Sequence, residues 1–194
     1  MSAESAEIAR GVRIELPPLA ERGAGRRTPD ERLLIRFPAL YRALAHGLSR
    51  LRPGSRLRRR LLARSIGRAY AAANRRDFDL VLAGWDLERE TEYRPGPDLL
   101  APDQETVFRG REGYLRMWGN WLDAFDDLRF EPEELLDMGD KVLVTAQQRA
   151  HGSGSGVAVS KPVFQLFQLR RGLVVWQHDF SERPEALLAA GLPG

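Results

Sequence analysis

The stretch VAVSKPVFQLFQLRRGLVVWQHDF, residues 157–180, decides how the second half of this chain folds. Apolar and polar side chains alternate along much of it, and a period of two is typical of a β-strand with one covered face. The segment Arg170-Arg171-Gly172 interrupts the alternation with a loop that ends in glycine. We therefore predict a β-hairpin whose strands cover residues 157–169 and 173–180.

The three-residue loop also predicts which residues of this hairpin lie opposite each other. With Leu169 opposite Leu173, counting back along the strands pairs Phe167 with Val175, Gln165 with Gln177, and Val163 with Asp179. The odd-numbered face is mostly apolar, so we expect it to be the covered face. Its polar exceptions, Gln165, Gln177 and Asp179, are candidates for a functional role.

The same period of two extends upstream into two further strands, residues 128–137 and 142–150, with turns at Gly139-Asp140 and at residues 152–156. Before this meander the apolar residues recur at helical spacing. We expect helices over residues 38–51, 55–73, 77–82 and 112–125, and a strand over residues 88–94. Helices followed by a long antiparallel meander predict an α+β domain with helices on one face of a curved sheet.

The helix that Ser55 can cap is the clearest in the sequence. Its apolar stripe runs from Leu57 to Ala73, and its arginines lie mostly off that stripe: Arg56, Arg58, Arg59, Arg60, Arg64 and Arg68. The fourth helix is unusually aromatic, because Tyr114, Trp118, Trp121 and Phe125 follow one another at spacings of four, three and four.

Charge is distributed unevenly along the chain. Residues 1–76 carry 18 Arg and 6 acidic residues, whereas residues 77–194 carry 12 Lys or Arg and 21 acidic residues. Together with the Pro and Gly content of the N-terminal segment, this pattern predicts a flexible tail over residues 1–28, a basic helical arm over residues 29–54 and an α+β domain over residues 55–194.

Several classes of protein and site are excluded by what the sequence lacks. It has no cysteine, which removes disulfides and thiolate metal sites. It has no phosphate loop, no His-Glu-x-x-His and no Gly-x-Ser-x-Gly, and His46, His151 and His178 lie far apart on different expected elements. We expect no metal and no cofactor. No apolar run approaches the ~18 residues of a membrane-spanning helix, so a soluble cytoplasmic protein is the expectation.

Several motifs, taken in order, carry a family resemblance. They are residues 70–78 (YAAANRRDF), residues 92–95 (EYRP), residues 108–113 (FRGREG), the Gly-Ser-Gly hairpin, residues 169–175 (LRRGLVV) and residues 185–187 (EAL). With the order of elements they resemble the nuclear transport factor 2-like superfamily and, within it, the SnoaL-like polyketide cyclase group. The resemblance implies a cystatin-like curved sheet wrapped around helices into a cone, with an internal cavity for a small, largely apolar molecule.

The ketosteroid isomerases of this superfamily offer a comparison of site positions. Where they place a carboxylate base this sequence has Tyr93, and where they place a protonated carboxylic acid it has Gln165. Their phenol falls on Ala69 or Tyr70. With the base absent, the resemblance does not carry over that isomerase mechanism.

Asp179 is the remaining acid that we expect to face inward. SnoaL-like cyclases use a cavity aspartate as acid and base, and the resemblance implies such a catalytic role for Asp179, with a pKa raised by burial. The alternative is that Asp179 pairs with Arg149 and only holds the sheet together. His178 is expected on the opposite face, in a contact surface.

The wall of the expected cavity combines aromatic and amide side chains that suit a flat or cyclic ligand. The candidate ligand-binding residues are Tyr70, Trp85, Tyr93, Trp118, Trp121, Gln147, Gln165, Phe167 and Gln177. The same aromatic residues also fit a plain hydrophobic core.

Two function classes follow for the domain. One is an isomerase, cyclase or epoxide-hydrolase-type enzyme that uses Asp179, and the other is a non-catalytic ligand-binding or scaffold domain. The apolar stripe Val174, Trp176, His178 and Phe180 predicts a homodimer. The Arg-rich arm either packs on the domain with its arginines in solvent or contacts an anionic membrane surface. Aromatic residues are sparse among its arginines, which argues against single-stranded nucleic acid.

Overall fold

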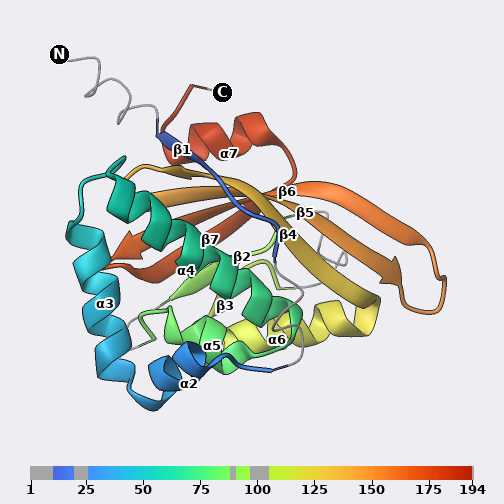
Figure 1. Cartoon of the computed structure of the whole chain (residues 1–194). Coiled ribbons are helices and arrows are strands. Elements are labelled where there is room, and N and C mark those ends of the chain that lie inside the picture. Colours follow the sequence, from blue (N-terminus) through green and yellow to red (C-terminus); the bar gives the residue numbers. More distant parts are fainter. Residues whose placement is uncertain (1–10, 20–25, 88–90, 97–104, 194) are drawn as a thin grey trace.

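A curved sheet forms the centre of this protein in its computed structural model, which describes residues 11–19, 26–87, 91–96 and 105–193 (Figure 1). Within these residues the strand order is β1-β4-β5-β6-β7-β2-β3. The strands are β1 (Val12–Glu15), β2 (Glu92–Arg94), β3 (Phe108–Arg109), β4 (Phe125–Asp137), β5 (Lys141–Gly152), β6 (Ala158–Arg170) and β7 (Leu173–Phe180). The helices are α2 (Pro29–Arg36), α3 (Pro38–Arg50), α4 (Arg56–Asn74), α5 (Phe78–Ala83), α6 (Gly110–Ala124) and α7 (Arg183–Ala190).

The four-strand meander and the four helices predicted before and beside it are confirmed. Ser55 caps α4 as expected, because its side chain accepts a hydrogen bond from the Arg58 backbone N–H. The predicted strand over residues 88–94 is confirmed for Glu92–Arg94, whereas residues 88–90 lie outside the described residues. β2 runs parallel to β7 and antiparallel to the two-residue strand β3, which the sequence did not reveal.

The expectation of a flexible tail over residues 1–28 is wrong for Val12–Glu15. This segment forms β1 and pairs antiparallel with the outer edge of β4, where Ile14 lies opposite Leu135. Val12 and Ile14 are buried while Arg13 and Glu15 are exposed. The alternation covers only four residues, which is too short to signal a strand without its partner. Residues 1–10 and 20–25 lie outside the described residues.

The register of the β6–β7 hairpin differs from the prediction by two residues. Arg171 and Gly172 both have positive φ and form a two-residue turn, so Arg170 pairs with Leu173. A β-bulge follows, after which Phe167 pairs with Gln177 and Gln165 with Asp179. Because the shift is even, the odd-numbered side chains stay on the covered face. The bulge also brings Val174 onto that face beside Leu169, which corrects its expected outward position.

Helices cover both faces of the sheet, although unequally. On the concave face α4 packs against β4, and α5 and α6 complete the main core. On the other face α7 covers Phe180 and forms a smaller core with Ala186, Ala190 and Leu166. The expected open stripe is therefore partly covered, leaving Trp176 and His178 half-buried. The homodimer through this face stays a prediction. No described helix is both long and apolar enough to cross a membrane.

Arg58 is the exception to the outward position expected for the α4 arginines, since its side chain is only 2% exposed. Its guanidinium donates two hydrogen bonds to Asp137 at the end of β4, each at 2.7 Å. It also donates to the Leu48 carbonyl within α3 at 3.2 Å, to the Leu51 carbonyl just after α3 at 3.1 Å, and to the Gly139 carbonyl in the β4–β5 turn at 2.6 Å. One side chain thus joins α3, α4, β4 and the β4–β5 turn.

We predict that Arg58→Met lowers the free energy of unfolding by about 3–5 kcal/mol, because it leaves the Asp137 carboxylate buried without a cation. Urea denaturation measures this loss. The double variant Arg58→Met/Asp137→Leu should recover part of it, and Arg59→Met, at an exposed neighbouring position, is the matched control. A loss in Arg58→Met no larger than in the control would contradict the role given to the ion pair.

Candidate active site

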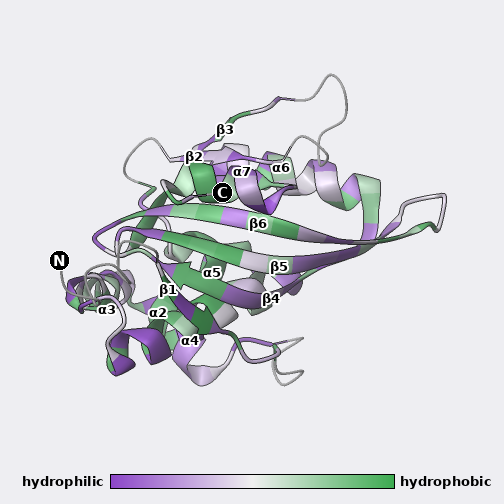
Figure 2. Cartoon of the chain, turned by 90° about the horizontal axis from the view of Figure 1, so that it is seen from above, coloured by the Kyte–Doolittle hydropathy of each residue, from purple (hydrophilic) through white to green (hydrophobic). Residues whose placement is uncertain are grey.

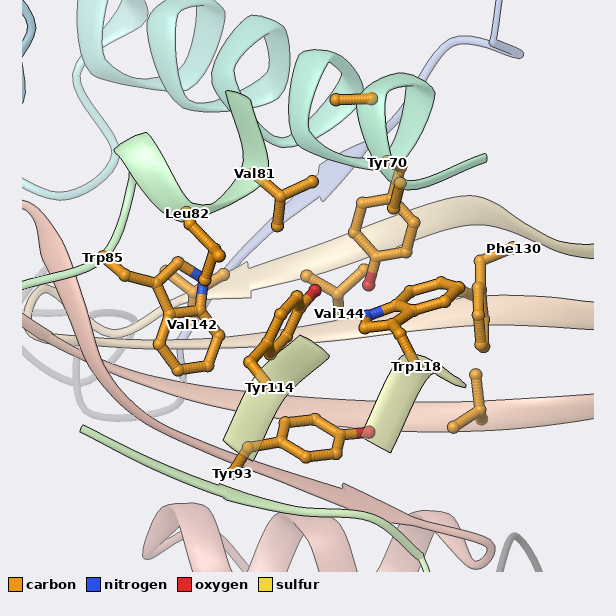
Figure 3. Close-up of a cluster of buried hydrophobic side chains, with 14 of the residues drawn as sticks. Tyr70, Val81, Leu82, Trp85, Tyr93, Tyr114, Trp118, Phe130, Val142 and Val144 are labelled. Atoms are coloured by element: carbon orange, nitrogen blue, oxygen red, sulfur yellow. The ribbon is translucent and has the colours of Figure 1, made fainter. Parts of the chain in front are cut away.

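A cavity of about 130 Å³ lies between the concave face of the sheet and the helices that cover it. Eight of the nine residues predicted to bind a ligand line this cavity: Tyr70, Trp85, Tyr93, Trp118, Trp121, Gln165, Phe167 and Gln177. Figure 3 shows Tyr70, Trp85, Tyr93 and Trp118, together with Tyr114, converging from α4, the segment after α5, β2 and α6. Most of the remaining lining is apolar, which suits a largely apolar molecule.

Gln147 is the predicted ligand-binding residue that does not line the cavity. It is half-buried and pairs across the sheet with Glu131 and Pro162. On β5 the buried positions Val142, Val144 and Ala146 are even-numbered, so the odd-numbered Gln147 lies on the other face. That run of even-numbered apolar residues is a signal in the sequence that could have given the correct face.

Asp179 lies at the centre of a network of neutral hydrogen-bond donors. Its carboxylate is fully buried and accepts a hydrogen bond from the Tyr93 hydroxyl at 2.5 Å. The Gln165 amide donates to the same oxygen, Oδ2, at 2.9 Å, and the Gln177 amide donates to Oδ1 at 2.8 Å. The Tyr70 hydroxyl in turn donates to Oε1 of Gln165. The network connects α4, β2, β6 and β7.

This network rules out one of the two sequence-based roles of Asp179, the ion pair with Arg149. Burial raises the pKa of Asp179 to about 6, although the hydrogen bonds from Gln177, Tyr93 and Gln165 act in the opposite direction. The expected partner Arg149 instead forms an ion pair with Glu131 at 3.0 Å on the exposed side of β5. The alternative of an Asp179–Arg149 pair is therefore wrong, and Asp179 is a buried acid whose hydrogen-bond partners are uncharged.

Asp179 lies one layer behind the cavity wall. Its three donors Tyr93, Gln165 and Gln177 line the cavity, whereas Asp179 itself does not. A molecule in the cavity would therefore meet Asp179 only through these side chains. Burial, together with the nearby Asp179 charge, raises the pKa values of Tyr70 and Tyr93 well above 10, so both phenols stay protonated at neutral pH.

A second polar group faces the cavity from α6. Figure 3 shows the Tyr114 hydroxyl and the Trp118 indole nitrogen directed toward the Tyr70 hydroxyl. Burial also raises the pKa of Tyr114. Around these groups the rings pack edge to face or tilted, for example Tyr93 against Tyr114 at 5.9 Å and Trp118 against Trp121 at 5.5 Å. The aromatic residues of α6 are thus both core and cavity wall.

The basic arm contributes to the site, which sequence reasoning missed. Tyr41, Leu48 and Ser49 of α3 line the cavity together with Arg58. The helix approaches the β6–β7 turn so closely that a Cβ at Gly172 would lie 2.1 Å from the Ala45 carbonyl oxygen. The only signal was the helical spacing of apolar residues from Tyr41 to Leu51, which predicts a buried face without saying what buries it.

The described residues contain no group of three His, Asp or Glu side chains arranged to share a metal ion. The arrangement offers hydrogen-bond donors and one acid for an oxygen-bearing organic molecule. His178 lies outside the cavity on the far face of β7, with its ring edge-on to Trp176 and tilted against Phe180. Burial, followed by the charge of Arg94, lowers its pKa.

A family model described as a SnoaL-like domain matches residues 66–177, more than half of the chain. The chain belongs to the SnoaL-like family. The matched part of this SnoaL-like protein begins within α4, so β1, α2 and α3 precede it. No match was found among the curated proteins.

Solved structures agree on the nuclear transport factor 2-like fold. TerC, co-crystallised with polyporic acid, has a TM-score of 0.54 at 18% identity, covering 66% of this chain and 95% of its own. An NTF2-like protein of unknown function from Burkholderia pseudomallei has a TM-score of 0.55 at 18% identity, covering 64% and 93%. A protein with a ketosteroid isomerase-like fold from Catenulispora acidiphila, in complex with trimethylamine, has a TM-score of 0.52 at 16% identity, covering 66% and 93%.

The pKa of Asp179 predicts how stability depends on pH. The unfolded chain releases this proton near pH 3.8 and the folded protein near pH 6, so between these values the folded state binds more protons and stability falls as pH rises. The difference between the two pKa values corresponds to a loss of about 3 kcal/mol at most in the free energy of unfolding. Above pH 6 this loss is complete.

We therefore expect Asp179→Asn to be neutral or stabilising at pH 7 and to lose that advantage at pH 4. Urea denaturation of both proteins at the two pH values gives the comparison, in which Asp30 and Asp77, whose pKa values are lowered, contribute equally to both proteins. Asp123→Asn, at an exposed position on α6, is the matched control. A clear loss of stability in Asp179→Asn at pH 7 would contradict the uncharged environment described above.

The approach of α3 to the β6–β7 turn predicts an unequal response of two glycines. Gly172 and Gly154 have nearly the same φ, +79° and +78°, but nothing lies within 4 Å of a Cβ at Gly154. Both alanine variants suffer the same backbone strain, and Gly172→Ala must also displace α3. We expect Gly172→Ala to lower the free energy of unfolding by about 1–3 kcal/mol more than Gly154→Ala does, as measured by urea denaturation. We also expect Gly172→Ala to speed tryptic cleavage at Arg42 and Arg50. Equal losses of stability in the two variants would contradict the close approach of α3 to the β6–β7 turn.

Proposed function

We propose that this SnoaL-like protein binds a small, largely apolar molecule with a carbonyl or hydroxyl oxygen, and moves a proton on it with Asp179 as the acid and base. The observation that carries the proposal is the direct hydrogen bond of the buried Asp179 carboxylate to Tyr93, a cavity-lining phenol. The reaction classes that fit are isomerase, cyclase and epoxide-hydrolase chemistry, all of which transfer protons at or beside an oxygen-bearing carbon.

The proton would travel through Tyr93. With Asp179 ionised, the Tyr93 oxygen accepts a proton from the bound molecule while its own hydroxyl proton passes to Asp179. The reverse transfer returns the proton and restores the carboxylate. The pKa of Asp179, about 6, lies close enough to neutral pH for both protonation states to be accessible. Gln177 carries a second amide N–H, beyond the one bound to Asp179, that can donate to a developing oxyanion.

The size of the cavity limits the ligand. A volume of about 130 Å³ is close to that of an engineered apolar cavity of about 150 Å³ that binds benzene. In this conformation of the protein the cavity therefore has room for a single six-membered ring. A ligand with more than one ring would require the elements that line the cavity, α3 among them, to move apart.

A second candidate function is ligand binding without catalysis. It is favoured by the position of Asp179 behind the wall and by the three donors that its carboxylate already has. In this case Gln165, Gln177 and the tyrosines orient the ligand, and Asp179 holds them in place.

The test uses cyclohexanone as the probe, because it has one ring and one carbonyl. Binding is followed by quenching of tryptophan fluorescence, and proton transfer by deuterium exchange at the carbons beside the carbonyl, measured by NMR in D₂O. We expect exchange catalysed by the wild type to fall about 100-fold or more in Asp179→Asn and in Tyr93→Phe, with little loss of binding. Gln147→Ala, which lies outside the cavity, is the control.

Each outcome assigns the function differently. Binding without catalysed exchange would support the non-catalytic candidate and overturn Asp179 as acid and base. Absence of both would overturn the cavity as the site for molecules of this class. If Tyr93→Phe catalyses deuterium exchange as fast as the wild type, the path through Tyr93 is overturned.

A further inference from the structure

The exposed apolar side chains of this protein gather at one corner. Eight large apolar side chains are exposed among the described residues, and six of them lie on or between α2, α3 and the first turns of α4. They are Leu33, Phe37, Leu40, Leu44, Leu57 and Leu61, each between 40% and 57% exposed. We call these six residues the corner patch. Figure 1 shows α3 along one edge of the molecule, with α2 at its lower end and the start of α4 at its upper end.

The corner patch draws on α3 and on the first turns of α4, two helices that pack against each other. The Tyr41 hydroxyl of α3 bonds to Ser65 of α4, which brings the two helices together at this level. Leu40 and Leu44 lie directly before and one turn after Tyr41, and Leu61 lies one turn before Ser65. Leu33 and Phe37 continue the patch into α2.

Positive charge surrounds the corner patch. No Asp or Glu occurs between residues 32 and 76, and the preceding acid, Glu31, is buried against Arg75 at 2.8 Å. The exposed basic residues here include Arg32, Arg36, Arg50, Arg56, Arg59 and Arg60. Figure 2 shows strongly hydrophilic and hydrophobic residues alternating along these helices. Leucines beside arginines on one surface fit lipid chains and anionic headgroups together.

We propose that the corner patch docks this protein on an anionic lipid bilayer. A second copy fits less well, because two such surfaces would bring their arginines against each other. A nucleic acid would use the arginines but leave the exposed leucines in water.

Docking there would place the bilayer against the helix that closes the cavity. Tyr41 and Leu48 of α3, each within one turn of the exposed Leu44, form part of the cavity wall. An apolar molecule dissolved in the bilayer would therefore need to pass only α3 to reach the cavity. Lipid contact and access to the site would involve the same helix.

The test is cosedimentation of the full chain with large unilamellar vesicles. Wild type should bind vesicles of 30% phosphatidylglycerol in phosphatidylcholine, bind pure phosphatidylcholine at least tenfold more weakly, and lose affinity as salt is raised from 0.1 to 0.5 M. Leu44→Ser/Leu61→Ser and Arg59→Gln/Arg60→Gln should each reduce binding more than tenfold, since each arginine near an anionic surface contributes about fivefold. These side chains are exposed, so the fold should be kept.

The matched controls are Leu188→Ser on α7 and Arg129→Gln on β4, both exposed and on other elements. They should bind like the wild type. Failure of the wild type to bind anionic vesicles, or equal loss in the controls, would overturn the proposal. Loss in the arginine variant without loss in the leucine variant would assign the corner to a soluble polyanion instead. A dimer in light scattering that the leucine variant abolishes, without vesicle binding, would assign it to a second copy.

Discussion

The buried ion pair between Arg58 and Asp137 is the constraint on which the rest of the structure depends. Its charges are nearly inaccessible to water, so the fold must supply every hydrogen bond that the guanidinium needs. Those bonds come from α3, from the residue after it and from the β4–β5 turn. As a result the basic arm is held against the sheet, and α3 becomes part of the cavity wall rather than a separate appendage.

The same sheet buries a second carboxylate, whose hydrogen-bond donors are neutral. Asp137 at the end of β4 meets a guanidinium, while Asp179 on β7 meets a phenol and two amides. Neutral donors stabilise a charge less than a cation does, so desolvation prevails at Asp179 and its pKa rises. One buried acid therefore holds the fold together, and the other can exchange a proton near neutral pH. The two buried acids therefore differ in role because their hydrogen-bond partners differ in charge.

The helix α3 has two kinds of surroundings. Its residues Tyr41 and Leu48 line the cavity and its backbone at Ala45 meets the β6–β7 turn, while Leu40, Leu44 and Arg50 are exposed to solvent. Since residues before Ile66 lie outside the matched family domain, the closing helix is an addition to the common cone. If the proposed membrane docking holds, this helix links lipid contact at the surface to ligand entry into the cavity.

The sequence by itself determined the meander, the four helices before and beside it, the covered face of β6 and β7, and eight of the nine predicted cavity residues. These features follow from local periodicity and from turn residues, which act over a few neighbouring positions. Only the tertiary structure decided the bulge that moved the register and brought Val174 inward, because a bulge depends on both strands. It also decided the pairing of β1, the burial of Arg58 and the position of Asp179 behind Tyr93, because each depends on residues more than 70 positions apart in the chain.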